Sequence, residues 1–210
     1  MITLYHCRDA RSFRPLWALE ELGLEYDLKL LPFPPRFLAR EFLAENPLGT
    51  IPLLVDGDTR MTESAAMIEY LSVRHGEGGL SVRPDEPGYG AYLNGLHFGE
   101  ATLTFPQTLV LRYARLEPEE RRNPQVASDY ARWFLARLKG LDLIVQDHPY
   151  VAADRFTGAD ISIAYALLLA TSLDLSGEFP PAVAAYWDRM SAREGFQRAQ
   201  QAQSGAPPSI

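Results

Sequence analysis

The hydrophobic pattern of this 210-residue chain changes character near residue 77, and this change limits the folds open to it. Before it, short strand-like runs at 2–5, 26–31, 52–55 and 59–61 alternate with helical stretches at 12–22, 37–44 and 64–74. After it, strand signals fade and helical patterns cover 87–114, 124–145, 158–173 and 181–190. The order βαβαββα followed by helices predicts a small α/β domain and then an all-helical domain.

The boundary between the two parts is predicted from a stretch rich in glycine and proline. Residues 76–79 read Gly-Glu-Gly-Gly, and two prolines follow between residues 82 and 88. We therefore expect a first domain at 1–76, a linker at 77–87 and a helical domain at 88–210. The polar segment 201–210 contains two prolines, so we expect a frayed C-terminal tail.

Composition narrows the range of functions. A formal net charge of −7 disfavours nucleic-acid binding, and no apolar run approaches the roughly 20 residues that span a bilayer. The N-terminus lacks the basic start and apolar stretch of a signal peptide, and the single cysteine, Cys7, cannot form an internal disulfide. We expect a cytoplasmic protein with no metal site and neither a membrane nor a nucleic acid as partner.

The first candidate binding feature is the pair Ile51-Pro52. Pro52 stands where a strand should begin, because proline cannot donate a ladder hydrogen bond. A cis bond at this point would turn the chain and leave the backbone N–H and C=O of Ile51 able to pair with an extended ligand. An ordinary trans proline after a loop is the plainer alternative.

The second feature is the pair Glu63-Ser64, directly after the hairpin. Ser64 is expected at a helix start, where a hydroxyl and the first-turn N–H groups form a site for a carboxylate. The carboxylate of Glu63 could pair with an ammonium, and the two residues together match an α-amino acid. Plain helix capping by Ser64, with Glu63 favourable to the helix dipole, is the alternative.

These two pairs, on the order βαβαββα, resemble the thioredoxin-like domain of soluble glutathione transferases, and the resemblance covers nearly the whole chain. It implies an α/β thioredoxin-like N-terminal domain followed by an all-α domain. It also implies that Ile51 and Pro52 hold the cysteinyl part of glutathione and that Glu63 and Ser64 hold its γ-glutamyl end. Glutathione as co-substrate and a homodimer are further implications.

The resemblance places a group that stabilises the glutathione thiolate between the first strand and the first helix. In this loop, residues 7–14, the serine of some classes falls on Ala10 and the cysteine of others on Arg11. Ser12 is the remaining hydroxyl, so we predict Ser12 as the catalytic donor and Arg11 as a supporting cation at the glutathione site. A helix cap at Ser12 and a solvated Arg11 are the alternatives.

The resemblance therefore implies an enzyme, a glutathione S-transferase that conjugates the thiolate to small hydrophobic electrophiles. A non-catalytic glutathione-binding scaffold or ligand carrier is one alternative, favoured by the missing serine or cysteine. A thiol oxidoreductase that uses Cys7 is another.

One motif in the helical part is expected to serve folding. Thr157 and Asp160 have the spacing of a capping box, and Phe156 and Ile161 that of a hydrophobic staple. The apolar run 161–170 follows, so we predict a buried helix that begins after Thr157.

Overall fold

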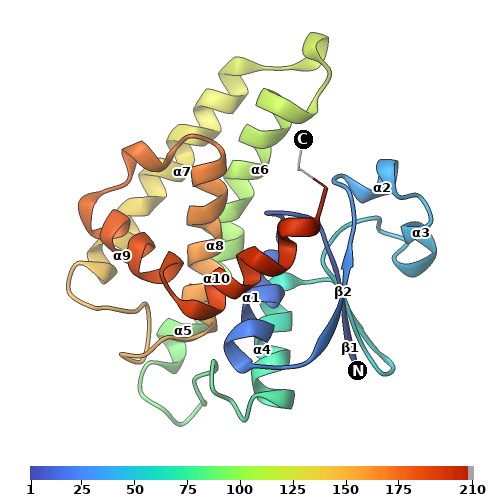
Figure 1. Cartoon of the computed structure of the whole chain (residues 1–210). Helices are drawn as coiled ribbons and strands as arrows, with labels where there is room; N and C mark the ends of the chain where they lie inside the picture. The colour runs from blue at the N-terminus through green and yellow to red at the C-terminus, as the bar shows by residue number, and fades with distance from the viewer. Residues whose placement is uncertain (208–210) are drawn as a thin grey trace. The chain divides into compact units, whose positions relative to one another are not determined.

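The structure of the chain is a computed structural model that describes residues 1–207, and these form two compact units. One unit contains residues 1–81 together with the described part of the segment that begins at Ala192. The other contains residues 82–191. Both units are drawn in Figure 1, and each is described separately below.

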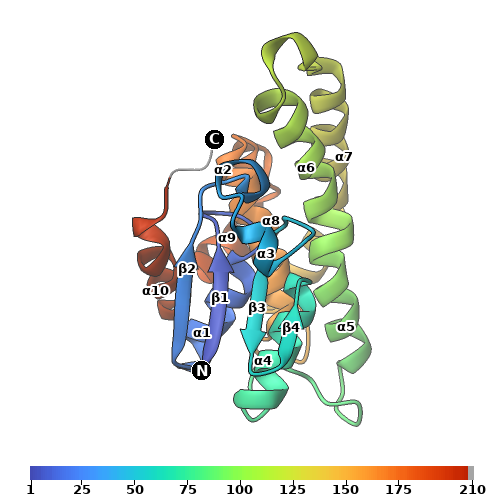
Figure 2. The ribbon, with the colours of Figure 1, turned by 90° about the vertical axis from the view of Figure 1, so that its right-hand side faces the viewer.

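The first unit is built on a mixed sheet whose strands are β1 (Ile2–His6), β2 (Tyr26–Leu30), β3 (Leu53–Asp56) and β4 (Thr59–Met61). Figure 2 shows them side by side in the order β2-β1-β3-β4. β1 is parallel to β2 and antiparallel to β3, which pairs antiparallel with β4. Its helices are α1 (Phe13–Leu22), α2 (Pro35–Leu38), α3 (Phe42–Glu45) and α4 (Ser64–His75).

This element order confirms the predicted α/β thioredoxin-like class, with one difference. The single helix expected at 37–44 is two short helices, because Ala39 leaves the helical region with φ −140° and ψ 68°. The buried Ala39 instead packs with Phe42 and Leu53 beneath the sheet residue Tyr5.

Alternation along β1 divides the sheet into two buried faces. Ile2 and Leu4 point to one face, which α1 and α4 cover, whereas Tyr5 points to the face that carries α2 and α3 (Figure 1). Leu54 lies opposite Leu4 and extends the α1 side of the core. Both faces are therefore covered, and the ends of the strands are left to carry binding residues.

The second unit is helical, as predicted. Its elements are α5 (Tyr89–His97), α6 (Phe105–Leu111), α7 (Pro124–Val145), α8 (Gly158–Ser172) and α9 (Pro181–Ser191), with wide π-type turns on both sides of α6. Residues 158–170 of α8 are all buried. Gly99 lies in the π-type segment between α5 and α6, and a Cβ at this position would overlap Ser162 of α8. Glycine therefore allows this segment and α8 to approach closely. No helix among the described residues is long and apolar enough to cross a membrane.

The C-terminal end differs from the expectation. α10 (Glu194–Ala202) and a 3-10 turn at Gln203–Gly205 belong to the α/β unit, and Gln203 is only 1% exposed. The predicted frayed tail is therefore wrong for residues 201–207, because a buried polar contact holds this segment. Residues 208–210 lie outside the described part, and the boundaries at 76 and 88 stay predictions.

Candidate functional site

Strand register brings the three predicted binding segments to one end of the sheet. Tyr5 near the end of β1 pairs with Leu53 at the start of β3, and Leu54 pairs with Met61 at the end of β4. Because β3 is antiparallel to both neighbours, its first residue lies beside their last residues. The segments 7–12, 51–52 and 63–64 therefore leave the sheet at the same end.

The peptide bond between Ile51 and Pro52 is cis, so the alternative of an ordinary trans proline is wrong. Ile51 lies just before β3, outside its pairing register. The buried Asn46 shapes the approach to this bond, since its side-chain amide donates to the Thr50 carbonyl at 2.7 Å and its oxygen accepts from the Leu48 N–H at 3.1 Å. A second cis bond, Phe33–Pro34, was not expected from the sequence.

The N-terminus of α4 has no capping side chain. Glu63 occupies the N-cap position in extended conformation, and its exposed carboxylate makes no cap hydrogen bond. Ser64 is the first helical residue, so the plainer alternative of capping by Ser64 is wrong. The first-turn N–H groups are thus left without a capping side chain, which is the arrangement that suits a bound carboxylate.

Arg14 is a residue of this site that was not expected from the sequence. Its guanidinium is fully buried, and Nη1 donates to Ser64 Oγ at 3.2 Å. A hydroxyl that accepts from a guanidinium keeps its own proton for another acceptor. Arg14 therefore orients Ser64 as a donor and brings positive charge to the N-terminus of α4. The available signal was an arginine among apolar residues at the start of α1.

The loop between β1 and α1 folds back on itself. Ser12 is fully buried; its Oγ accepts from the Cys7 N–H and donates to the Cys7 carbonyl, both at 3.2 Å. The Ser12 hydroxyl thus binds within the loop, and it makes no cap hydrogen bond to α1. Arg11, beside it, is half-buried on the same loop. The structure brings both residues to the end of the sheet that carries the other predicted segments.

Cys7 is not a reactive thiol. Its side chain is fully buried, and burial raises the pKa of Cys7 to about 12. A thiol with this pKa is protonated at neutral pH and is a poor nucleophile. Burial and the raised pKa of Cys7 therefore argue against the alternative of an oxidoreductase that uses this thiol.

Comparison with known proteins identifies the family. The model of the glutathione S-transferase N-terminal domain matches residues 10–74, and that of the glutathione S-transferase C-terminal domain matches residues 103–194. Glutathione S-transferase 2 of Saccharomyces cerevisiae is 30% identical over 165 residues, which cover 75% of this chain and 70% of the yeast protein. The chain belongs to the glutathione S-transferase family.

Other relatives of this transferase are similar to it over most of their length. Glutathione S-transferase 3 of Schizosaccharomyces pombe is 27% identical over 183 residues, 81% of this chain and 74% of that protein. The solved glutathione S-transferase of Xylella fastidiosa is 25% identical, with a TM-score of 0.79 over 99% of this chain and 100% of that one. The likeness therefore extends through both units of the transferase.

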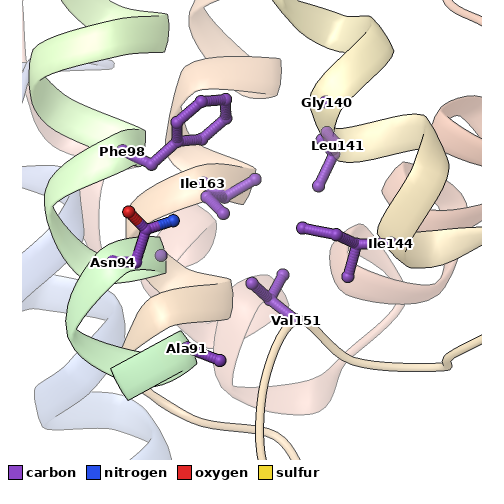
Figure 3. A pocket seen from close by; sticks show the side chains of 9 residues that line it. Ala91, Asn94, Phe98, Gly140, Leu141, Ile144, Val151 and Ile163 are labelled. Atoms are coloured by element: carbon purple, nitrogen blue, oxygen red, sulfur yellow. The ribbon is translucent and has the colours of Figure 1, made fainter. Parts of the chain in front are cut away.

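The helical unit of the transferase contains a separate hollow of about 220 Å³. Figure 3 shows it between apolar side chains that include Phe98, Leu141 and Ile163, with the amide of Asn94 at its margin. None of the predicted glutathione-binding residues lines it. No group of three or more potential metal-binding side chains occurs among the described residues.

Proposed function

We propose that this glutathione transferase conjugates the thiolate of glutathione to small hydrophobic electrophiles, and that residues 51–52 and 63–64 hold the tripeptide. The observation that carries the proposal is the N-terminus of α4, which lacks a capping side chain and presents Ser64 with its hydroxyl oxygen bonded to Arg14. A helix N-terminus beside a buried cation favours a carboxylate, and the exposed Glu63 favours an ammonium.

In this proposal the γ-glutamyl end of glutathione lies at α4. Its carboxylate accepts from Ser64 and the first-turn N–H groups, and its amine binds Glu63. The backbone of Ile51, beside the cis Pro52, pairs with the cysteinyl residue in an extended, strand-like manner. The sulfur then lies toward the loop that contains Arg11 and Ser12, at the same end of the sheet.

The role proposed for the loop is to stabilise the thiolate. A glutathione thiol is mostly protonated at neutral pH, and positive charge or a donor near the sulfur favours its ionised form. Arg11 supplies charge, and the N-terminus of α1 supplies oriented N–H groups. For Ser12 to donate to the sulfur, its hydroxyl must turn away from the Cys7 carbonyl, to which it donates at 3.2 Å.

Binding and ionisation of glutathione test the function directly. We expect calorimetry to detect binding of glutathione and of S-substituted analogues, and ultraviolet titration to show a thiol pKa lower in the complex than in free glutathione. Ser12→Ala and Arg11→Ala report which residue contributes, because each removes one candidate group. No binding at millimolar ligand would refute the proposal, and an unshifted thiol would favour the non-catalytic scaffold.

Arg14 gives a second prediction. Arg14→Met is expected to raise the KM for glutathione about tenfold, because Ser64 loses the bond that orients its hydroxyl. Arg14→Lys keeps the charge, so its KM for glutathione should lie between those of Arg14→Met and the parent. A glutathione analogue without the γ-glutamyl α-carboxylate should bind parent and Arg14→Met equally. If the analogue also loses affinity in Arg14→Met, Arg14 acts on the fold rather than on this subsite.

We also propose that the transferase works as a homodimer in the cytoplasm. The family resemblance supports the dimer. A single cysteine that is buried and unpaired suits a reducing compartment.

A further inference from the structure

The C-terminal segment of the transferase docks against the first helix of the α/β unit. The ring of Phe196 in α10 packs edge-on against Phe13 and Trp17, with ring centroids 5.2 and 5.0 Å apart. Arg193 makes a bidentate pair with Glu21 at 2.8 and 2.9 Å. These contacts hold α10 along α1, and the chain after α10 continues to the loop between β1 and α1.

Gln203, directly after α10, places its amide in that loop. Its Oε1 accepts from the Asp9 N–H at 3.0 Å, and its Nε2 donates to the Asp9 carboxylate at 2.6 Å. The same Oε1 lies 2.9 Å from Nε2 of His6. Because an amide oxygen only accepts, Nε2 of His6 carries the proton, and burial lowers the pKa of His6 to about 4, so the ring is neutral at pH 7. One side chain from the C-terminal end thus makes two hydrogen bonds to Asp9 in the loop and a third to His6 at the end of β1.

Asp9 is the residue of the loop that most needs this support. Its φ of +53° lies in the left-handed region, which residues other than glycine adopt uncommonly and aspartate adopts mainly where its side chain is hydrogen-bonded. The paired bonds from Gln203 engage both the backbone and the side chain of Asp9 in this conformation. Because the chain turns at Asp9, this conformation determines where Ala10, Arg11 and Ser12 lie.

We propose that Gln203 is a positioning residue for the glutathione sulfur. Its two hydrogen bonds to Asp9, called the clamp below, fix the backbone conformation that places residues 10–12 beside the thiolate. The inference rests on the proposed function, which places the sulfur at this loop. Gln203 makes no hydrogen bond to residues 51–52 or 63–64 in the described structure. Loss of the clamp therefore lowers ionisation and turnover, and it leaves the affinity for glutathione nearly unchanged.

Gln203→Met tests this in the full chain, because methionine keeps the length of the side chain and removes its hydrogen bonds. We expect the pKa of the bound thiol to rise by about one unit and kcat to fall about tenfold, with the KM for glutathione within about twofold of the parent. Gln201→Met is the matched control, because Gln201 is exposed on the same segment. This variant should have the thiol pKa, kcat and KM of the parent.

A double variant, Gln203→Met with Asp9→Gly, separates positioning from general stability. Glycine adopts the left-handed region freely, so the double variant should recover most of the lost kcat and match Asp9→Gly alone. The proposal is overturned if Gln203→Met keeps the thiol pKa and kcat of the parent, or if the double variant recovers nothing. A parent that does not lower the thiol pKa refutes the proposed function and this inference together, whereas a lowered pKa that Gln203→Met retains refutes this inference alone.

Discussion

Replacing Glu63 with Gln and Ser64 with Ala in one variant is expected to weaken glutathione binding about a thousandfold. In the proposed site, Glu63 binds the amine of the ligand and Ser64 binds its carboxylate. Each substitution removes a hydrogen bond to a charged group, worth roughly 1.5–3 kcal/mol. Two such losses give about 4 kcal/mol, near the lower end of the summed range, because neighbouring substitutions are not fully additive.

The fold should tolerate this double variant. Glu63 makes no cap hydrogen bond, whereas alanine at position 64 removes an acceptor of the buried Arg14 guanidinium. We therefore expect the free energy of unfolding to fall by roughly 1–3 kcal/mol, with the variant still folded at the temperature of the titration. Calorimetric titration with glutathione measures the affinity. Asp58→Asn is the matched control, because Asp58 is exposed in the turn at the opposite end of the β3–β4 hairpin. A double variant that binds within tenfold of the parent would contradict the proposed site.

Asp160→Ala is expected to lower the free energy of unfolding by about 4 kcal/mol. The Asp160 carboxylate is fully buried in the helical unit. It accepts from the Thr157 N–H at 2.9 Å, the Thr157 hydroxyl at 3.2 Å, the Val151 N–H at 3.0 Å and the Tyr186 hydroxyl at 2.9 Å. Alanine would leave these four donors buried without their acceptor, and each unsatisfied donor costs roughly 1–3 kcal/mol before the structure relaxes.

Urea unfolding of parent and variant at pH 7 measures this difference. Asp160→Asn should lower the free energy of unfolding by less than Asp160→Ala, because the amide keeps one acceptor oxygen. Asp147→Ala, at an exposed position after α7, should change stability by less than about 0.5 kcal/mol. A loss below about 1 kcal/mol for Asp160→Ala would mean that Asp160 adds little beyond the helix cap.

Local signals in the sequence were strong enough to predict most helices and strands. The helix predicted at 124–145 coincides with α7, where Asn123 accepts from the Val126 N–H at the cap and Pro124 opens the helix. The capping box of Thr157 and Asp160 is likewise confirmed at the start of α8. Caps, prolines and apolar periodicity act within a few residues, so they can be recognised without knowledge of the tertiary structure.

The sequence alone also identified the segments proposed to bind glutathione, since Ile51-Pro52 and Glu63-Ser64 are each contiguous. Only the tertiary structure decided which residues support them. Arg14 and Ser64 are 50 positions apart, and Gln203 and Asp9 are 194 apart. Hydrogen bonds between residues so distant in the sequence leave no local pattern. The segment that contains Gln203 is polar and contains prolines, so its composition is typical of a frayed tail. The folded chain alone shows that this glutamine is buried against the loop that precedes α1.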